Sequence, residues 1–260
     1  MTTGGSPYSR RPDNRRVDIV GEIPDLLPAP HERIRVVAGA LILDFDGTIL
    51  DTETPQYRAW CEVYEAHGLE PLDIDLWRTN IGLDPGSERF DPYDHLTSLV
   101  GRVDTEIAVT RRRHRMMDLI RAEEPRRGIV GWLAFARSRG LAVGVASSSP
   151  IGWVSEHLDR LQLGFEFEVV SCAGGGLRGK PAPDVYLDAC ARLGADPGAS
   201  LAVEDSPPGV RAARAAGLRC LAVPNPVTAG MDFVGATVVA GSLADLDPSA
   251  LLDRATGPDA

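Results

Sequence analysis

The sequence predicts an α/β fold, a doubly wound parallel sheet of the Rossmann-like type, with an α-helical domain inserted into it. The first observation is a set of short apolar runs with the length and composition of buried strands. They occupy residues 36–46, 141–149, 167–172, 200–206 and 219–225. The second observation is that amphipathic helical segments, such as 206–217, separate these runs. This alternation favours a parallel sheet with helices on both faces.

A third observation locates the insertion. Between residues 54 and 127 the strand-like runs stop, and the segments 57–68 and 105–124 have helical periodicity instead. Residues 1–36 are rich in Pro, Gly, Arg and Asp and lack periodicity, which is typical of a disordered tail. The predicted division is therefore a tail at 1–36, an α/β core at 37–53 and 128–260, and a helical cap at 54–127.

Composition and charge narrow the classes of function. The chain has 260 residues, of which 43% are hydrophobic, enough for a sizeable core. Its formal net charge of −10 argues against a nucleic-acid partner. It has neither an apolar run as long as a membrane span nor a secretory signal, so no membrane partner is expected. Four cysteines without a C-x-x-C pair suit a reducing cytoplasm. These features predict a cytoplasmic enzyme, expected as a monomer, that acts on a small molecule.

Acidic side chains follow two of the predicted strands at the point where each strand ends. Asp44 and Asp46 end the first run, before the turn residue Gly47, and Glu204 and Asp205 end the fourth. Two carboxylates two residues apart on an extended strand face the same side. Ligands bind at the carboxyl ends of the strands in an open parallel sheet, so these groups are expected to converge. Because carboxylates without a cation repel one another, the cluster predicts a Mg²⁺ site.

Hydroxyl groups and one lysine are expected at the same edge of the sheet. Ser147, Ser148 and Ser149 end the second run. Lys180 lies in "AGGGLRGKPAP", which fits two nucleotide-binding patterns, G-x-G-x-x-G and G-x-x-x-x-G-K. Both are rejected because Pro181 stands where a phosphate loop needs Ser or Thr, and the next helix can begin no earlier than about Pro183. Lys180 is therefore predicted to be a phosphate-binding cation on an extended loop.

The combination of motifs resembles the haloacid dehalogenase-like superfamily of phosphotransferases. "DFDGT", a strand-ending Ser147, "KPAPDVY" and "VEDSPPGVRAARAAG" follow one another in the order of that superfamily's four motifs. The match covers roughly residues 38–226. A helical insertion directly after the first motif is similar to the cap of the phosphoglycolate phosphatase and β-phosphoglucomutase branch. The resemblance implies a Rossmann-like core with an inserted cap.

The resemblance also implies a role for each carboxylate. Asp44 would attack phosphorus and form an aspartyl-phosphate. Asp46 would protonate the leaving oxygen and then deprotonate the incoming water or hydroxyl. Mg²⁺ would be held by the Asp44 carboxylate, the Asp46 main-chain carbonyl and Asp205. Glu204 would be a further ligand or a partner of the ligands. Ser147, Ser148 and Lys180 would bind the transferring phosphoryl group.

The expected function is a Mg²⁺-dependent phosphatase for a small phosphorylated metabolite, such as a sugar phosphate or phosphoglycolate. A β-phosphoglucomutase-like mutase is the alternative. Hydrolysis is preferred because Gln56 stands where mutases usually have histidine, and no cap arginine that grips a second phosphate is identified. A non-catalytic phosphometabolite-binding protein is the third hypothesis, the weakest because every catalytic position is filled. The residues expected to set substrate specificity are Gln56, Arg78, Asn80, Asp84 and Arg89.

Other features of the cap are expected to be structural. The arginine run at 111–115 is interpreted as a solvated helix face. His67, before a glycine, is interpreted as a helix-terminus residue. Trp60, Val63 and Tyr64 have helical spacing and are predicted to belong to the hydrophobic core of the cap.

Overall fold

The computed structural model describes residue 1, residues 39–81 and residues 89–252. The predicted tail at 1–36, apart from its first residue, and the specificity candidate Asp84 lie outside the described residues. Within the described ranges, none of the helices is both long enough and apolar enough to cross a lipid bilayer.

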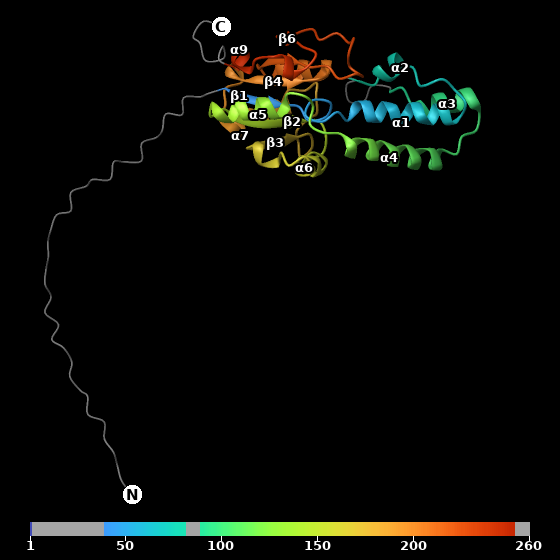
Figure 1. Cartoon of the computed structure of the whole chain (residues 1–260), viewed down its shortest axis with the longest axis horizontal. Coiled ribbons are helices and arrows are strands. Elements are labelled where there is room, and N and C mark those ends of the chain that lie inside the picture. Colours follow the sequence, from blue (N-terminus) through green and yellow to red (C-terminus); the bar gives the residue numbers. More distant parts are fainter. Residues whose placement is uncertain (2–38, 82–88, 253–260) are drawn as a thin grey trace, which may run out of the picture. The chain divides into compact units, whose positions relative to one another are not determined.

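A six-stranded sheet in which every neighbouring pair is parallel forms the centre of the fold (Figure 1). Its strands are β1 (Ala40–Leu43), β2 (Ala142–Ser147), β3 (Val169–Cys172), β4 (Leu201–Glu204), β5 (Arg219–Ala222) and β6 (Val238–Val239). The five predicted runs contain the first five strands, so the predicted fold class is confirmed. The short β6 was not predicted, because two residues are too few for a periodic signal.

The strand order is β3-β2-β1-β4-β5-β6. The chain therefore adds β2 and β3 on one side of β1 and then crosses to the other side, where it adds β4, β5 and β6. Leu43 is in register with Val145 of β2 and Val203 of β4. This registration brings the residues that follow β1, β2 and β4 to one edge of the sheet, at the point where the strand order reverses, which is where ligands bind in such sheets.

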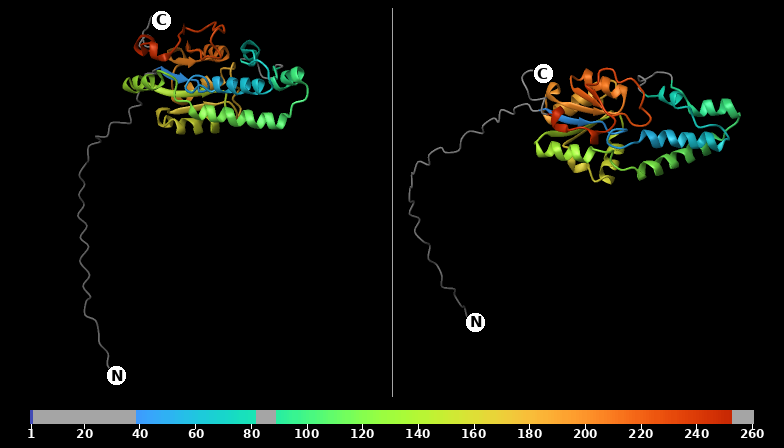
Figure 2. Two further views of the ribbon diagram at one scale, coloured as in Figure 1. Left: turned by 45° about the vertical axis from the view of Figure 1, so that its right-hand side comes forward. Right: turned by 45° about the horizontal axis from the view of Figure 1, so that its top comes forward.

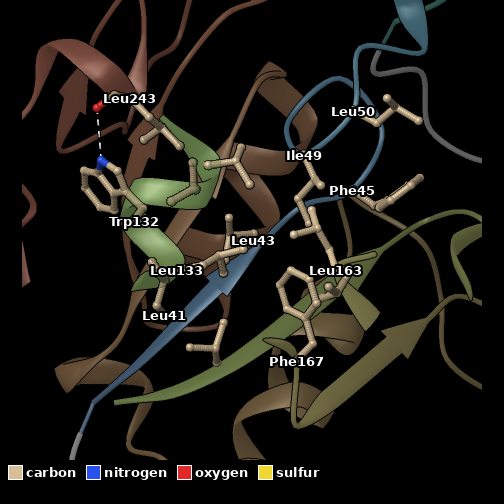
Figure 3. Close-up of a cluster of buried hydrophobic side chains, with 14 of the residues drawn as sticks. Leu41, Leu43, Phe45, Ile49, Leu50, Trp132, Leu133, Leu163, Phe167 and Leu243 are labelled. Atoms are coloured by element: carbon tan, nitrogen blue, oxygen red, sulfur yellow. Dashed lines mark hydrogen bonds between the residues drawn. The ribbon is translucent and has the colours of Figure 1, made fainter. Parts of the chain in front are cut away.

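Helices cover both faces of the sheet (Figure 1). They are α5 (Ile129–Ser138), α6 (Ile151–Arg160), α7 (Asp184–Leu193), α8 (Pro207–Ala215) and α9 (Pro248–Leu252). Successive β1 side chains alternate between the faces. Leu41 and Leu43 belong to a cluster with Trp132 of α5 (Figure 3), whereas Ile42 belongs to a second cluster with Tyr186 of α7. All three aliphatic side chains are fully buried, each contributing about 1.5–3 kcal/mol to folding.

Four helices of the described residues lie between β1 and α5 in the sequence, where the cap was predicted. They are α1 (Glu53–Ala66), α2 (Ile74–Arg78), α3 (Pro92–Val100) and α4 (Thr105–Ala122). Helices α1 and α4 run side by side (Figures 1 and 2). Trp60, Val63 and Tyr64 of α1 are buried in a separate hydrophobic cluster, as predicted. His67 is the C-cap residue directly after α1, in agreement with its interpretation as a helix-terminus residue, and its Nδ1 lies 2.8 Å from the carbonyl oxygen of Val63.

Candidate active site

The turn after β1 fixes the first two carboxylates. The backbone amide of Asp44 donates to the Val203 carbonyl of β4 at 2.9 Å, which extends the β1–β4 pairing by one residue. The chain then turns at Gly47, which has a φ of 80°. A Cβ atom at this glycine would lie 2.1 Å from Oδ2 of Asp205, so the close approach of the turn to that carboxylate requires glycine.

A buried lysine lies between two of the acidic residues. Lys180 Nζ contacts Asp44 Oδ1 and lies 2.6 Å from Glu204 Oε1. The same Glu204 oxygen accepts a hydrogen bond of 2.6 Å from the Tyr186 hydroxyl of α7. Burial by itself lowers the pKa of Lys180, but the charges of Asp44 and Glu204 raise it above its ordinary value. Lys180 is therefore an ammonium ion paired with two carboxylates.

The loop that carries Lys180 is fixed against the end of β2. The backbone amide of Lys180 donates to Ser148 Oγ at 3.0 Å, and the amide of Ser149 donates to Ser147 Oγ at 3.0 Å. Helix α7 begins immediately after Pro183, in agreement with the predicted start. The predicted phosphate-binding residues Ser147, Ser148 and Lys180 are therefore neighbours.

Asp44, Glu204 and Asp205 form a group that fits a metal ion. Each offers a carboxylate oxygen within 4.8 Å of the others, and all three are buried. Burial raises the pKa of Asp44 to about 8, although Lys180 opposes the effect. Burial, together with the charges of Asp44 and Glu204, raises the pKa of Asp205 well above its ordinary value. Three buried carboxylates facing one ammonium ion leave an excess of negative charge, and a hard divalent cation suits oxygen donors of this kind.

Asp205 is held in place from two sides. Its Oδ2 accepts a hydrogen bond of 2.7 Å from the Asn225 side-chain amide, and its Oδ1 accepts one of 3.3 Å from Thr48 Oγ1. Arg126, just before α5, donates to the carbonyl of Gly47 and to that of Val223 at 2.8 Å. Sequence reasoning did not identify Asn225 or Arg126, because their partners lie far away in the chain.

Asp46 is half-buried and accepts three side-chain hydrogen bonds. Thr52 Oγ1 and Trp153 Nε1 each donate to Oδ1 at 2.9 Å, and Ser149 Oγ donates to Oδ2 at 2.6 Å. The donors come from the start of α1, the first turn of α6 and the turn after β2. Asp46 therefore lies beside the acidic cluster, in a separate network of donors.

The carboxylates lie against a cavity of about 750 Å³, between the edge of the sheet and the segment 53–120. The predicted site residues that line the cavity are Asp44, Asp46, Ser147, Ser148, Lys180, Asp205, Gln56, Asn80 and Arg89. Glu204 lies behind them, fully buried. The volume is in the range of small-molecule binding sites.

Arg78 is a correction to the predicted specificity residues. It is absent from the described residues that line the cavity. Its Nε donates to the Val227 carbonyl at 2.8 Å, and its terminal nitrogen donates to the Ala229 carbonyl. Arg78 instead joins α2 to the loop that follows β5, because that loop presents main-chain acceptors at the end of α2.

Arg112 corrects the interpretation of the 111–115 run as a solvated face. It lines the cavity, and its guanidinium lies over the Trp60 ring, 4.8 Å from the centroid. Its Nε donates to the Tyr93 hydroxyl at 3.2 Å. Met116 and Ile120 also line the cavity. Arg112, Met116 and Ile120 are spaced i, i+4, i+8 and therefore share one helix face. This spacing is the feature of the sequence from which the position of Arg112 could have been predicted.

Glu53 is a second cavity residue that sequence reasoning missed. It begins α1 and lines the cavity. Burial, with the charges of Asp46 and Asp51, raises the pKa of Glu53 to about 7. Glu53 lies nine residues after Asp44, beyond the turn, and no periodic pattern in the sequence indicated that it would face the cavity.

Comparison with known proteins identifies the family. The model of the haloacid dehalogenase-like hydrolases matches residues 38–217. The chain is 39% identical to the Bacillus subtilis protein named "Putative phosphatase YhcW", over 83% of this chain and 96% of that protein. It is 33% identical to hexitol phosphatase B of Escherichia coli K12, over 82% and 96% of the respective chains. Among solved structures, "putative beta-phosphoglucomutase from Thermotoga maritima" superposes with a TM-score of 0.63 and 26% identity, over 83% and 97% of the chains.

The chain belongs to the haloacid dehalogenase-like hydrolase family. The resemblance to its phosphoglycolate phosphatase and β-phosphoglucomutase branch is confirmed. The predicted enzyme class, a hydrolase of phosphoric monoesters, is confirmed at the level of the family and its phosphatase relatives.

Proposed function

We propose that the chain is a Mg²⁺-dependent phosphatase that hydrolyses a small sugar phosphate or a similar metabolite through an aspartyl-phosphate on Asp44. The observation that carries the proposal is the pairing of a buried Asp44 with Lys180, beside two further carboxylates, at a cavity of about 750 Å³. The sugar-phosphate class is supported by the hexitol phosphatase relative, which is 33% identical over most of both chains.

In the first step, an oxygen of the Asp44 carboxylate attacks phosphorus, and the bond from phosphorus to the ester oxygen of the substrate breaks. Lys180 holds Oδ1, which leaves Oδ2 as the attacking atom. Asp46 donates its proton to the leaving oxygen, so the product leaves as a neutral alcohol. The phosphoryl group is then bonded to Asp44.

In the second step, Asp46 takes a proton from water as the water oxygen attacks the same phosphorus. The bond from phosphorus to Asp44 breaks, which releases phosphate and restores the carboxylate. Ser147, Ser148 and Lys180 supply hydrogen bonds and positive charge to the phosphoryl oxygens during both steps. Asp44, the main-chain carbonyl of Asp46 and Asp205 would hold Mg²⁺, with Glu204 as a partner of Lys180. The bound cation would neutralise charge on the transferring phosphoryl group.

The cavity wall opposite the carboxylates suits a hydroxylated, anionic substrate. Gln56 and Asn80 offer amide groups for sugar hydroxyls, and Arg89 and Arg112 offer positive charge. Trp60 adds an apolar ring surface. A small phosphorylated metabolite is therefore the proposed partner. Its cytoplasmic setting and the monomeric state of the enzyme stay predictions from the sequence.

A mutase is the second candidate because Arg112 supplies the cap cation that sequence reasoning had not identified. A mutase must hold a sugar bisphosphate by its second phosphate while the first is exchanged with Asp44. Arg89 and Arg112 both line the cavity and could bind that second phosphate. Gln56, which stands where mutases usually have histidine, still favours water as the acceptor.

The test is phosphate release from a panel of sugar phosphates and short-acid phosphates, measured with Mg²⁺ and after removal of metal by a chelator. We expect phosphate release that depends on Mg²⁺. Incubation with β-glucose 1-phosphate, a bisphosphate primer and Mg²⁺ should yield free phosphate and little glucose 6-phosphate. Rapid isomerisation with negligible phosphate release would establish the mutase, and release that persists without metal would contradict the proposed site.

A further inference from the structure

We infer that Trp153 is a positioning residue for acid–base catalysis: its indole N–H fixes one oxygen of Asp46 and leaves the other oxygen to carry the proton. The inference rests on the proposed role of Asp46. Trp153 lies in the first turn of α6 and lines the cavity. None of the motifs discussed above includes it, since it comes six residues after the strand-ending Ser147.

The two oxygens of Asp46 have different kinds of neighbours. Oδ1 accepts from Trp153 Nε1 and from Thr52 Oγ1, each at 2.9 Å. Oδ2 accepts from Ser149 Oγ at 2.6 Å. An indole N–H can only donate a hydrogen bond, whereas a hydroxyl group can donate or accept.

This difference decides where a proton can be carried. A proton on Oδ1 would face the indole N–H, which has no lone pair to receive it, and the two hydrogens would repel each other. Within the described part of the chain, the hydrogen-bond partner of Oδ2 is the Ser149 hydroxyl, which can rotate and become an acceptor for a proton on Oδ2. Oδ1 is therefore the fixed acceptor in both protonation states. Oδ2 is the oxygen that gives the proton to the leaving group and takes one from water.

The indole is itself held by a stack of rings. Trp153 packs edge to face on His157, with ring centroids 4.3 Å apart, and His157 stacks on Phe45 with centroids 6.3 Å apart. His157 is 1% exposed. Phe45 stands in the chain between Asp44 and Asp46, so the stack ties α6 to the turn that carries both carboxylates. The indole has little room to move away from Oδ1.

The consequence can be measured through the leaving group. Hydrolysis of glucose 6-phosphate expels a basic sugar alkoxide, which needs a proton from Asp46. Hydrolysis of p-nitrophenyl phosphate expels a weakly basic phenolate, which leaves without one. A misplaced Asp46 should therefore slow the first reaction far more than the second. A general loss of structure would slow both.

The experiment uses the full chain with Mg²⁺ and compares Trp153→Phe with Trp132→Phe. The control also removes an indole hydrogen bond, from Trp132 Nε1 to the Leu243 carbonyl at 3.0 Å, but in the hydrophobic core (Figure 3). For Trp153→Phe we expect kcat on glucose 6-phosphate to fall about tenfold, a small part of the effect of a general acid. KM for both substrates and kcat on p-nitrophenyl phosphate should stay within about twofold. Trp132→Phe should leave the ratio of the two kcat values unchanged.

Equal effects on both substrates, or a selective increase on glucose 6-phosphate, would overturn the inference. A wild-type chain that hydrolyses neither ester would instead contradict the proposed function. A second measurement does not require a folded Trp153→Phe variant. The chain has four tryptophans, and one indole N–H resonance of the wild type should move upfield in Asp46→Ala while the other three stay in place. If all four resonances stay in place, the contact with Asp46 is absent and the inference fails.

Discussion

The floor and the roof of the cavity are built in different ways. On the floor, Asp44 and Asp205 directly follow β1 and β4, and Ser147 is the last residue of β2, so the register of the sheet decides their spacing. On the roof, Gln56 and Arg112 belong to helices α1 and α4, which run side by side, and α1 packs in a separate hydrophobic cluster. In the proposed function, the groups that meet the reacting phosphorus lie on the sheet edge, and the groups that meet the rest of the substrate lie on the helices. Chemistry and selectivity can therefore change independently.

The largest expected effect on activity comes from a substitution on the floor, at Asp44. Asp44→Asn should lower kcat by at least roughly a thousandfold, because a neutral amide is a far weaker nucleophile than the carboxylate it replaces. The folded state should survive, since the change removes one of three crowded buried carboxylates. Asp94→Asn, at an exposed position on α3, is the matched control and should retain full activity. Phosphate-release kinetics and thermal melting check both variants, and substantial turnover by Asp44→Asn would rule out its role as nucleophile.

A smaller, metal-dependent loss is expected at Asp205. Asp205→Asn keeps one oxygen that can bind a cation but removes its charge, so it should weaken Mg²⁺ binding and partly recover activity at high Mg²⁺. Calorimetric titration with Mg²⁺ measures the affinity without turnover. An effect equal to that of Asp44→Asn and insensitive to Mg²⁺ would contradict the separate roles of the two residues.

Substitutions on the roof should affect substrate binding rather than kcat. Arg112→Gln should raise KM for a sugar bisphosphate about tenfold and leave kcat within about twofold, because the guanidinium would contact the second phosphate and not the phosphorus that Asp44 attacks. Arg113→Gln, the exposed neighbour on the same helix, is the control and should leave KM unchanged. A fall in kcat at unchanged KM would instead link Arg112 to the chemical step.

The smallest effect is expected on stability, at the junction of floor and roof. The pKa of Glu53 is raised from 4.5 to about 7, so between these values the folded chain binds more protons at this residue than the unfolded chain. Its contribution to the free energy of unfolding therefore falls as pH rises from 4.5 to 7. Glu53→Gln should raise Tm by a few degrees at pH 8, and the gain should vanish near pH 4. Glu65→Gln, at an exposed position on α1, should show no such gain, and a gain for Glu53→Gln that is independent of pH would contradict the ionisation argument.

The difference between floor and roof also explains which parts of the site could be predicted from the sequence. Asp44, Ser147 and Asp205 were found because an apolar run has a visible end, and ends of parallel strands meet at one edge. Arg112 was missed because a run of arginines on a helix is usually exposed to solvent. Its spacing of four and eight residues from Met116 and Ile120 would have indicated that it faces the cavity instead. Arg78 was assigned to the cavity because a sequence gives no indication that the loop after β5 would offer its carbonyls. Trp153 gave no signal, because its partner Asp46 lies 107 residues away.

Because of the loop after β5, the cap cannot simply be exchanged for the cap of another protein. Val227 comes from the core side of the sequence but is buried in the hydrophobic cluster of the cap, and its carbonyl binds Arg78. Two residues earlier, Asn225 donates to Asp205 and accepts from the backbone amide of Val227. A chimaera that exchanges residues 54–127 alone would leave Val227 facing a foreign surface and would disturb the support of Asp205. A graft intended to change substrate preference should therefore carry residues 224–230 together with the cap.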